Sequence, residues 1–185
     1  SVAVTGLTDP VSLTLNGQKN ILYVAESSVN QVRRVFLNAA NQESNKEVAV
    51  TGISNPDAPA LTKDGKILFV GQHIVGSIWR VPLSASGSVV ATDLMKIASG
   101  LNRPRGLLLS ADETMLYVAE DVAGRVHRYE LVSGDYTYIT LQSGMMRPYG
   151  LALTPGEDKL IVSDYLANSV SYLYPLPDTP SQPTG

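Results

Sequence analysis

Short apolar runs separated by turn-forming residues recur along the whole chain. In one representative stretch the runs cover 95–99, 106–109, 115–120 and 125–131. Runs of this length, bounded by turn residues, predict β-strands. No segment has a sustained helical period, so the pattern predicts an all-β protein with essentially no helix.

One spacing of residues occurs four times without an insertion. Each copy has a glycine, a proline four residues later, a polar residue sixteen further on and, in three copies, an arginine eight after that. The glycines are Gly6, Gly52, Gly100 and Gly144, the prolines Pro10, Pro56, Pro104 and Pro148, the polar residues Glu26, Gln72, Glu120 and Asp164, and the last positions Arg34, Arg80, Arg128 and Tyr172. Such a period indicates a repeat architecture, in which the shared residues describe the scaffold.

The second run of each repeat is apolar on both faces in most copies, as in a strand that is buried on both sides. These runs cover 21–25, 67–71, 115–119 and 159–163, and each ends in a small residue that lets a neighbouring sheet approach closely. Four-stranded sheets that cover one another predict a β-propeller with blades of about 40–50 residues. The repeat prolines, which are 46, 48 and 44 residues apart, agree with this prediction.

The repeats divide the chain into a propeller at 1–175 and a proline-rich tail or linker at 176–185. The repeats cover about 1–45, 46–92, 93–136 and 137–175. Residues 1–5 match 48–51, the outermost strand of a blade, whereas the fourth copy stops after its third strand. We therefore predict four four-stranded blades, with the N-terminal strand closing the last one. Closure onto a neighbouring molecule, or a four-blade section of a larger propeller, are the alternatives.

Composition narrows the function classes. A hydrophobic content of 44% and a net charge of −3 fit an ordered globular protein, and without a basic stripe the chain is not expected to bind nucleic acid. No apolar run approaches the length of about 18 residues that a membrane span needs. The absence of cysteine excludes disulfides and thiolate metal sites. Frequent Ser, Thr, Asn and Gly with few Lys favour an extracellular or periplasmic location, and the start at Ser1 fits a trimmed or excised product, for example after signal-peptide removal.

Two segments carry a resemblance to a known superfamily. Residues 104–120 (Pro-Arg-Gly-Leu-Leu-Leu-Ser-Ala-Asp-Glu-Thr-Met-Leu-Tyr-Val-Ala-Glu), followed by 125–131, resemble one blade of the NHL-repeat propellers. They are equally similar to the gluconolactonase/regucalcin-like and strictosidine-synthase-like proteins. Residues 148–164, followed by Asn168, match the NHL pattern of proline, glycine, an acidic strand end and a downstream asparagine. The resemblance covers nearly the whole chain up to Pro175 and implies a β-propeller, although propellers of this superfamily usually have more than four blades.

The lactonase-like branch implies a metal ion in the central channel, held by Glu, Asn and Asp side chains near the starts of inner strands. The positions that match here, each after a repeat proline, are Val11, Asp57, Arg105 and Tyr149. Only Asp57 suits a hard cation such as Ca²⁺, and Arg105 would repel one. We therefore expect an Asp57–Arg105 ion pair between adjacent blades, and neither a metal ion nor another cofactor.

The repeated polar residues Glu26, Gln72, Glu120 and Asp164 could be read as a ring of catalytic carboxylates. A group that occurs once per blade is more simply structural. We expect these side chains to satisfy the loop between the second and third strands and to pair with the residue eight positions later.

The sequence contains no recognisable catalytic constellation. It has no nucleophile elbow, zinc-protease motif or phosphate-binding glycine loop. His73 follows a second strand on the face where propellers usually bind ligands but has no evident nucleophile, and His127 is expected on a blade surface. The candidates for a binding face are Asp57, Arg105, Tyr149, His73, Asp121, Tyr165, Asn102, Arg103 and Arg147.

These observations favour a non-enzymatic binding or assembly module that associates with a protein partner or with itself. A lactonase-like metal-dependent hydrolase is the alternative. A third reading makes the chain one part of a larger propeller that another chain completes.

Overall fold

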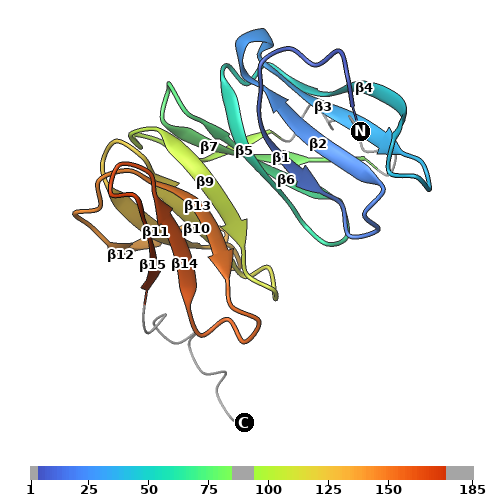
Figure 1. Ribbon diagram of the computed structural model, residues 1–185. Coiled ribbons are helices and arrows are strands. Elements are labelled where there is room, and N and C mark those ends of the chain that lie inside the picture. Colours follow the sequence, from blue (N-terminus) through green and yellow to red (C-terminus); the bar gives the residue numbers. More distant parts are fainter. Residues whose placement is uncertain (1–3, 85–93, 174–185) are drawn as a thin grey trace.

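The computed structural model of the protein describes residues 4–84 and 94–173 (Figure 1). These residues form four antiparallel sheets that follow one another as the blades of a four-bladed β-propeller. The only helical element in the described ranges is a single 3₁₀ turn at Ser27–Val29. None of the described residues form a helix that is long and apolar enough to cross a membrane. The predicted tail at 176–185 lies outside the described residues.

Each blade takes its strands in sequence order from the centre outward. The first contains β1 (Pro10–Leu15), β2 (Ile21–Glu26), β3 (Gln31–Leu37) and β4 (Glu43–Thr51), and the second β5 (Pro56–Leu61), β6 (Ile67–Gln72), β7 (Ser77–Pro82) and β8 (Met95–Ala98). The third contains β9 (Pro104–Leu109), β10 (Met115–Glu120), β11 (Arg125–Glu130) and β12 (Tyr138–Gln142), and the last β13 (Pro148–Leu153), β14 (Leu160–Asp164) and β15 (Ser169–Leu173).

The blades pack face to face, and β1 lies beside β5, β5 beside β9 and β9 beside β13. We call the side of a blade that faces the next blade along the chain its leading face, and the opposite side its trailing face. At the first junction the leading-face residue Val32 packs with the trailing-face residues Leu68 and Val70. The next two junctions repeat this arrangement with the following blades.

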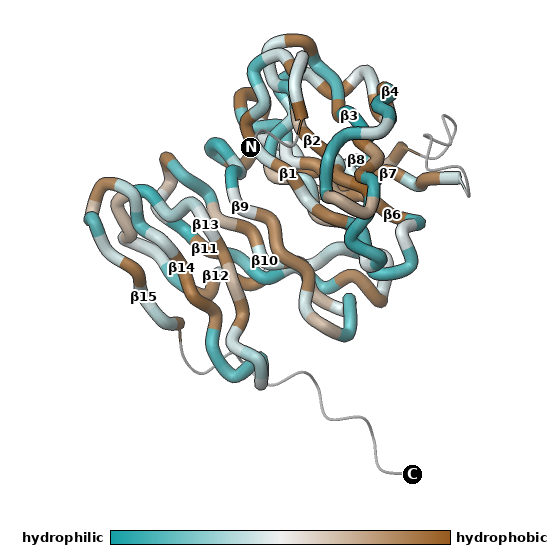
Figure 2. The backbone as a smooth tube through the Cα atoms, turned by 45° about the vertical axis from the view of Figure 1, so that its right-hand side comes forward, coloured by the Kyte–Doolittle hydropathy of each residue, from teal (hydrophilic) through white to brown (hydrophobic). Residues whose placement is uncertain are grey.

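Alternation along the strands supplies both faces of each blade, because successive side chains of a strand point to opposite sides of the sheet. The second strands are the most deeply buried, and every residue of β10 is buried. Figure 2 shows hydrophobic residues concentrated in the strands and hydrophilic ones in many of the turns. Burying each large aliphatic side chain contributes about 1.5–3 kcal/mol, so these junctions supply most of the hydrophobic stabilisation.

In every blade, the turn between the second and third strands has a residue with left-handed backbone conformation at the same repeat position. These residues are Asn30, Gly76, Gly124 and Asn168, with φ of 55°, 74°, 63° and 51°. Asparagine and glycine tolerate this region of φ/ψ space better than other residues. The Gly124 carbonyl accepts a hydrogen bond of 3.1 Å from the Met145 N–H of the next blade, and a Cβ at Gly124 would lie 2.1 Å from the Met145 carbonyl oxygen.

The predicted closure of the last blade by the N-terminal strand is wrong for the part that the structure describes. Residues 1–3 lie outside the described residues, and residues 4 and 5 form no strand. The Thr5 N–H donates to Glu43 at 3.4 Å and its carbonyl accepts from Lys46 at 2.7 Å, and both partners belong to β4 of the first blade. The first and last sheets lie apart in Figures 1 and 2, so this short segment beside β4 lies far from β15. In the described ranges the last blade therefore has three strands.

Candidate functional site

Three inner strands bring charged and aromatic side chains together at one end of the propeller axis. Asp57 of β5, Arg105 of β9 and Tyr149 of β13 each follow the proline that begins the strand, so they lie at equivalent heights. The pair predicted between adjacent blades is present, since Arg105 Nη1 lies 3.6 Å from Asp57 Oδ2. The same Nη1 donates a hydrogen bond of 2.9 Å to the Tyr149 hydroxyl.

Asp57 is the most buried member of this group, with a side chain that is 1% exposed. Its Oδ1 accepts a hydrogen bond of 2.8 Å from the Ala58 N–H, whereas its buried Oδ2 has no hydrogen-bond partner among the described residues. Burial raises the pKa of Asp57, and the Ala58 N–H and the charge of Arg105 offset part of that rise.

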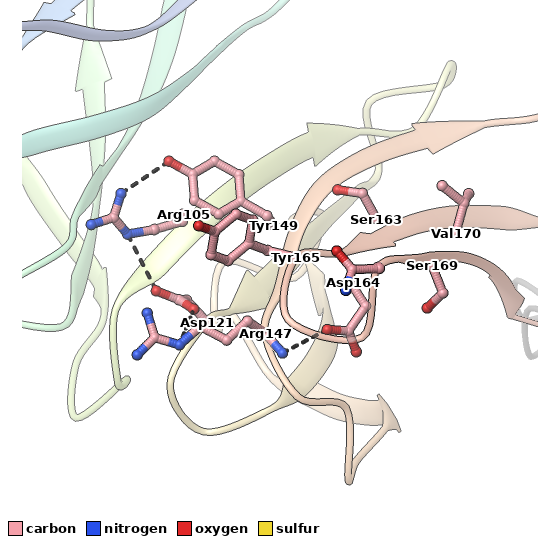
Figure 3. Close-up of a pocket in the computed structure, with 10 residues that line it drawn as sticks. Arg105, Asp121, Arg147, Tyr149, Ser163, Asp164, Tyr165, Ser169 and Val170 are labelled. Atoms are coloured by element: carbon pink, nitrogen blue, oxygen red, sulfur yellow. Dashed lines mark hydrogen bonds and ion pairs between the residues drawn. The ribbon is translucent and has the colours of Figure 1, made fainter.

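Asp121 and Arg147 extend the network toward the last blade. Arg105 Nε lies 3.4 Å from Asp121 Oδ2, and Arg147 Nε lies 3.4 Å from Asp121 Oδ1 (Figure 3). Burial acts to lower the pKa of Arg105, but the hydrogen bond to Tyr149 and the nearby carboxylates raise it overall, so the guanidinium stays charged. Two carboxylates and two guanidinium groups therefore alternate and balance in charge. We call Asp57, Arg105, Asp121 and Arg147 the axial network.

His73 borders the axial network, with Nδ1 3.9 Å from Asp57 Oδ2. Burial and then the neighbouring charge of Arg105 lower the pKa of His73. A neutral imidazole at this distance forms neither an ion pair nor a hydrogen bond with Asp57.

The axial residues do not fit the metal ion that a lactonase-like propeller would hold. A hard cation needs several oxygen ligands, and Arg105 places a positive charge 3.6 Å from Asp57 and 3.4 Å from Asp121, the two carboxylates of the axial network. Among the described residues no group of three or more His, Cys, Asp or Glu side chains could hold a metal ion. We therefore derive no metal-dependent step for this site.

A pocket of about 700 Å³ opens beside the axial network, on the leading side of the last blade. Its size falls within the range of about 300–1,000 Å³ that is usual for small-molecule sites. It is lined by Arg105, Asp121, Arg147, Tyr149, Ser163, Asp164, Tyr165, Asn168, Ser169 and Val170 (Figure 3).

The structure places the nine predicted binding-face residues in three groups. Arg105, Asp121, Arg147, Tyr149 and Tyr165 line the pocket. Asp57 and His73 lie at the far side of Arg105, outside the pocket lining. Asn102 and Arg103 are exposed, and their carbonyls accept hydrogen bonds from the Val122 and Asp121 N–H groups.

Sequence reasoning missed the wall of the pocket that the last blade supplies. Ser163 and Val170 are strand residues whose counterparts in the other blades are small or apolar core residues. The repeat pattern assigns Ser163 and Val170 the same core position as their counterparts. Only their location on the last blade, whose leading face is uncovered in the described residues, makes them pocket residues.

The repeated polar side chains bind the segment that precedes each first strand, eighteen residues earlier in every blade. Glu26 accepts from the Thr8 N–H at 2.6 Å, and Asp164 accepts from the Met146 N–H at 2.9 Å. Gln72 donates to the Ser54 hydroxyl at 2.7 Å, and Glu120 accepts from the Asn102 N–H. These residues therefore hold the entrance of the first strand. Asp164 also accepts a hydrogen bond of 3.3 Å from the Ala167 N–H, in the loop between the second and third strands as predicted.

The predicted pairing with the residue eight positions later is wrong. Glu26 is bound by Arg33 at 2.7 Å, whereas Arg34 lies across from Tyr23, on the other face of the sheet, and forms an ion pair with Glu47. Alternation of the strand explains the error, because a residue seven positions later returns to the same face and one eight positions later does not. Arg80, Arg128 and Tyr172 lie across from Phe69, Tyr117 and Ile161 in the same way.

His127 occupies this seventh position in the third blade, and its predicted place on a blade surface is wrong. It is buried, with Nε2 2.8 Å from Glu120 and Nδ1 3.1 Å from the Thr140 hydroxyl. Burial acts to raise the pKa of Glu120, but the bonds from Arg125, His127 and Asn102 lower it overall. Glu120 is therefore an ionised, saturated carboxylate, which is unsuited to act as a general acid.

Comparison with solved structures identifies many propellers of the same architecture. A carbohydrate-active enzyme from Trichoderma reesei matches 98% of this chain and 56% of its own, with a TM-score of 0.79 and 15% identity. A chain of the nidogen/laminin complex matches 92% of this chain and 61% of its own, with a TM-score of 0.73 and 16% identity. A periplasmic gluconolactonase from Pseudomonas aeruginosa matches 91% of this chain and 54% of its own, with a TM-score of 0.68 and 16% identity.

These comparisons show the β-propeller fold that gluconolactonase-like and nidogen/laminin propellers share. The chain spans between 42% and 61% of the length of such structures. A scan of the sequence against protein-family models finds no match, and neither does a search of curated proteins.

Proposed function

We propose that this chain is a non-enzymatic propeller that serves as a binding or assembly module for protein partners, further copies of itself included, outside the cytoplasm. The observation that carries the proposal is the position of Arg105. Its guanidinium lies between the buried carboxylates of Asp57 and Asp121, where a metal-dependent hydrolase of this fold would need a cation.

Two further features support binding over catalysis. The repeated carboxylates are saturated by backbone N–H groups and basic side chains, so they are not poised for proton transfer. The pocket beside the axial network has an exposed aromatic side chain, Tyr165, next to the charged residue Arg147, a combination typical of binding surfaces. The fold is shared with a chain of a nidogen/laminin complex, which is compatible with a protein partner.

A lactonase-like, metal-dependent hydrolase is the second candidate. It is favoured by the buried Asp57 Oδ2, which accepts no hydrogen bond from the described residues, and by the fold shared with a periplasmic gluconolactonase. The same likeness, with the Ser-, Thr- and Asn-rich composition, supports a location outside the cytoplasm.

Isothermal titration calorimetry with CaCl₂, together with a hydrolysis assay on gluconolactone, tests the proposal. The wild-type chain and Asp57→Ala should show the same heats, without stoichiometric binding, and neither should hydrolyse the lactone. Asp135→Ala removes an exposed carboxylate outside the site and serves as the matched control. Stoichiometric calcium binding that is lost in Asp57→Ala and kept in Asp135→Ala would overturn the proposal in favour of the hydrolase.

A further inference from the structure

The outermost strand of the third blade, β12, is a free sheet edge within the described residues. The sheet has the order β12-β11-β10-β9, so β12 pairs with β11 on one side only and lies at the outer rim of its blade (Figure 1). The third blade has a neighbouring blade on each of its two faces, so this edge belongs to an internal repeat. A free edge presents backbone N–H and C=O groups that can pair with a further strand.

The outer edges of the first two blades have features that protect a sheet against such pairing. β4 contains Glu43, Lys46 and Glu47, and β8 has only four residues, of which Lys96 is exposed. Charged side chains and short strands at an edge disfavour the addition of another strand. β12 contains no charged residue, and none occurs anywhere in 136–146. Among the four-stranded blades of the described ranges, the third therefore has the edge that is most open to a further strand.

β12 also has the composition of a strand that pairs. Its residues are Tyr, Ile, Thr, Leu and Gln, and the first three favour strands. Tyr138 is 55% exposed, yet its ring stacks on Tyr129 with centroids 4.9 Å apart and meets His127 edge-to-face at 5.0 Å. Because these two neighbours hold the exposed ring in place, little of its conformational entropy is left to lose on binding. Tyrosine is also among the residues enriched at the energetic centres of protein interfaces.

The absence of charge points to a second copy of the chain as the partner. When two identical strands pair antiparallel about a two-fold axis, each residue near the axis faces its own counterpart. A charged residue there would meet a like charge, which is destabilising, so a self-pairing edge has to be neutral near the axis. An edge that selects a foreign peptide uses charges or side-chain pockets for specificity, and β12 presents no charge.

A pairing centred on Thr140 uses the whole strand. It places Thr140 opposite Thr140 of the second copy, Ile139 opposite Leu141, and Tyr138 opposite Gln142. Successive residues of a strand point to opposite faces, so the two members of each pair lie on the same face of the joined sheet. Apolar side chains therefore meet on one face, and uncharged polar and aromatic side chains meet on the other.

We propose that β12 pairs antiparallel with β12 of a second copy and joins the third blades of two propellers into one continuous sheet. This rests on the proposed function as an assembly module and names the partner as the chain itself. The contact is isologous, so it closes at a dimer. A strand pair of five residues is a small interface, and we therefore expect weak association, with a dissociation constant in the micromolar range or above.

Sedimentation velocity of the whole 185-residue chain, from about 1 μM to about 1 mM, tests the proposal. The wild-type chain should convert from monomer to dimer. Thr140→Lys places two ammonium groups opposite each other and should raise the dissociation constant by roughly tenfold or more. Thr140→Val also loses the hydroxyl that contacts His127 but adds no charge, so it should dimerise like the wild type. Val132→Lys, at a 71% exposed position in the loop between β11 and β12, should do the same.

A mixture of two charged variants identifies the two-fold contact. Thr140→Lys and Thr140→Glu should each remain monomeric at concentrations at which the wild type dimerises. In an equimolar mixture the two opposite charges meet at the axis, so dimers should reappear. Recovery in the mixture also shows that both variants are folded.

Cross-linking tests the register. The chain has no cysteine, so Thr140→Cys supplies a single thiol. Directly opposite residues of an antiparallel pair have Cα atoms about 4.5–5.5 Å apart, which lies within the range of about 4.4–6.8 Å that a disulfide requires. Under mild oxidation Thr140→Cys should form a disulfide-linked dimer faster than Val132→Cys does.

Three results would each overturn the proposal. They are a wild type that stays monomeric throughout, a Thr140→Lys chain that dimerises as well as Thr140→Val, and a Thr140→Cys chain that cross-links no faster than Val132→Cys. Failure of the proposed function is distinguishable from these results. Calcium binding that depends on Asp57 would overturn the non-enzymatic function without changing the sedimentation result, and a monomeric chain would leave the calorimetric test unaffected.

Discussion

Individual polar residues hold the blades in shape, and Glu120 shows how. Its carboxylate is fully buried, yet it accepts bonds from Arg125 at 2.9 Å, from His127 at 2.8 Å and from the Asn102 N–H. Because each donor favours the charged form, the pKa of Glu120 is lowered from its usual value of 4.5 in spite of burial. Glu26 has a lowered pKa for the same reason, with Thr8, Gln31 and Arg33 as the donors.

The variant Glu120→Gln should reduce the free energy of unfolding by about 1–3 kcal/mol at pH 7, since an amide cannot accept from all of these donors. A lowered folded-state pKa contributes stability that is fully present above 4.5 and is lost as the pH falls through the folded-state value. The difference between wild type and variant should therefore narrow on acidification below pH 4.5, as urea denaturation would show. Asp135→Asn, at an exposed position, is the control. A difference that stays constant with pH would contradict the assignment.

At the scale of single elements, close approach of neighbouring strands sets the spacing of the blades. Gly106 in β9 faces the next blade, and a Cβ there would lie 2.1 Å from the Tyr149 carbonyl oxygen and 3.2 Å from Leu151 Cγ, both in β13. The two backbones can pack at this distance only because residue 106 has no side chain.

We expect Gly106→Ala to reduce the free energy of unfolding by about 1–3 kcal/mol, because the added methyl group must push β9 and β13 apart. Gly156→Ala is the matched control, since the nearest atom to its new Cβ would be Asp158 Oδ1 at 3.9 Å, an ordinary contact. Thermal and urea denaturation of both variants measures the effect. Equal stability of the two variants would contradict the prediction, because β9 and β13 would then move apart at little cost in free energy.

The elements themselves were largely predictable from the sequence, because strand alternation and turn residues are local signals. The run at 115–120 coincides with β10, and the run at 125–131 exceeds β11 by one residue. Side-chain partners were less predictable. The period of the repeat marks Arg34 as well as Glu26, but only the register shows that Arg33 shares the face of Glu26.

At the scale of the whole molecule, the sequence did not predict the contacts that depend on where the N-terminal segment and the last blade lie in space. The likeness of residues 1–5 to 48–51 led to the prediction of a closing strand, yet Thr5 contacts Glu43 and Lys46 of its own blade. The sequence of a short strand-like segment does not specify with which distant sheet edge the segment pairs. The pocket wall at Val170 was hidden for the same reason, since its sequence context matches that of fully buried residues.

The uncovered leading face of the last blade also predicts how stability is distributed along the chain. In a repeat protein, each unit is stabilised mainly by its neighbours, so a terminal unit with one free face opens more readily than an internal one. All residues of β10 are buried, whereas β13 has three exposed residues. Hydrogen exchange followed by mass spectrometry should therefore show faster exchange in the segment 148–173 than in 104–130.

The last two blades provide the comparison within one molecule. Val170 of β15 and Val126 of β11 hold the same repeat position, yet Val170 is 65% exposed and Val126 is 0% exposed. Local opening of the last blade therefore breaks fewer packing contacts than opening of the third blade. Exchange that is equally slow in 148–173 and in 104–130 would contradict the prediction, because the exposure of Val170 would then have no bearing on local stability.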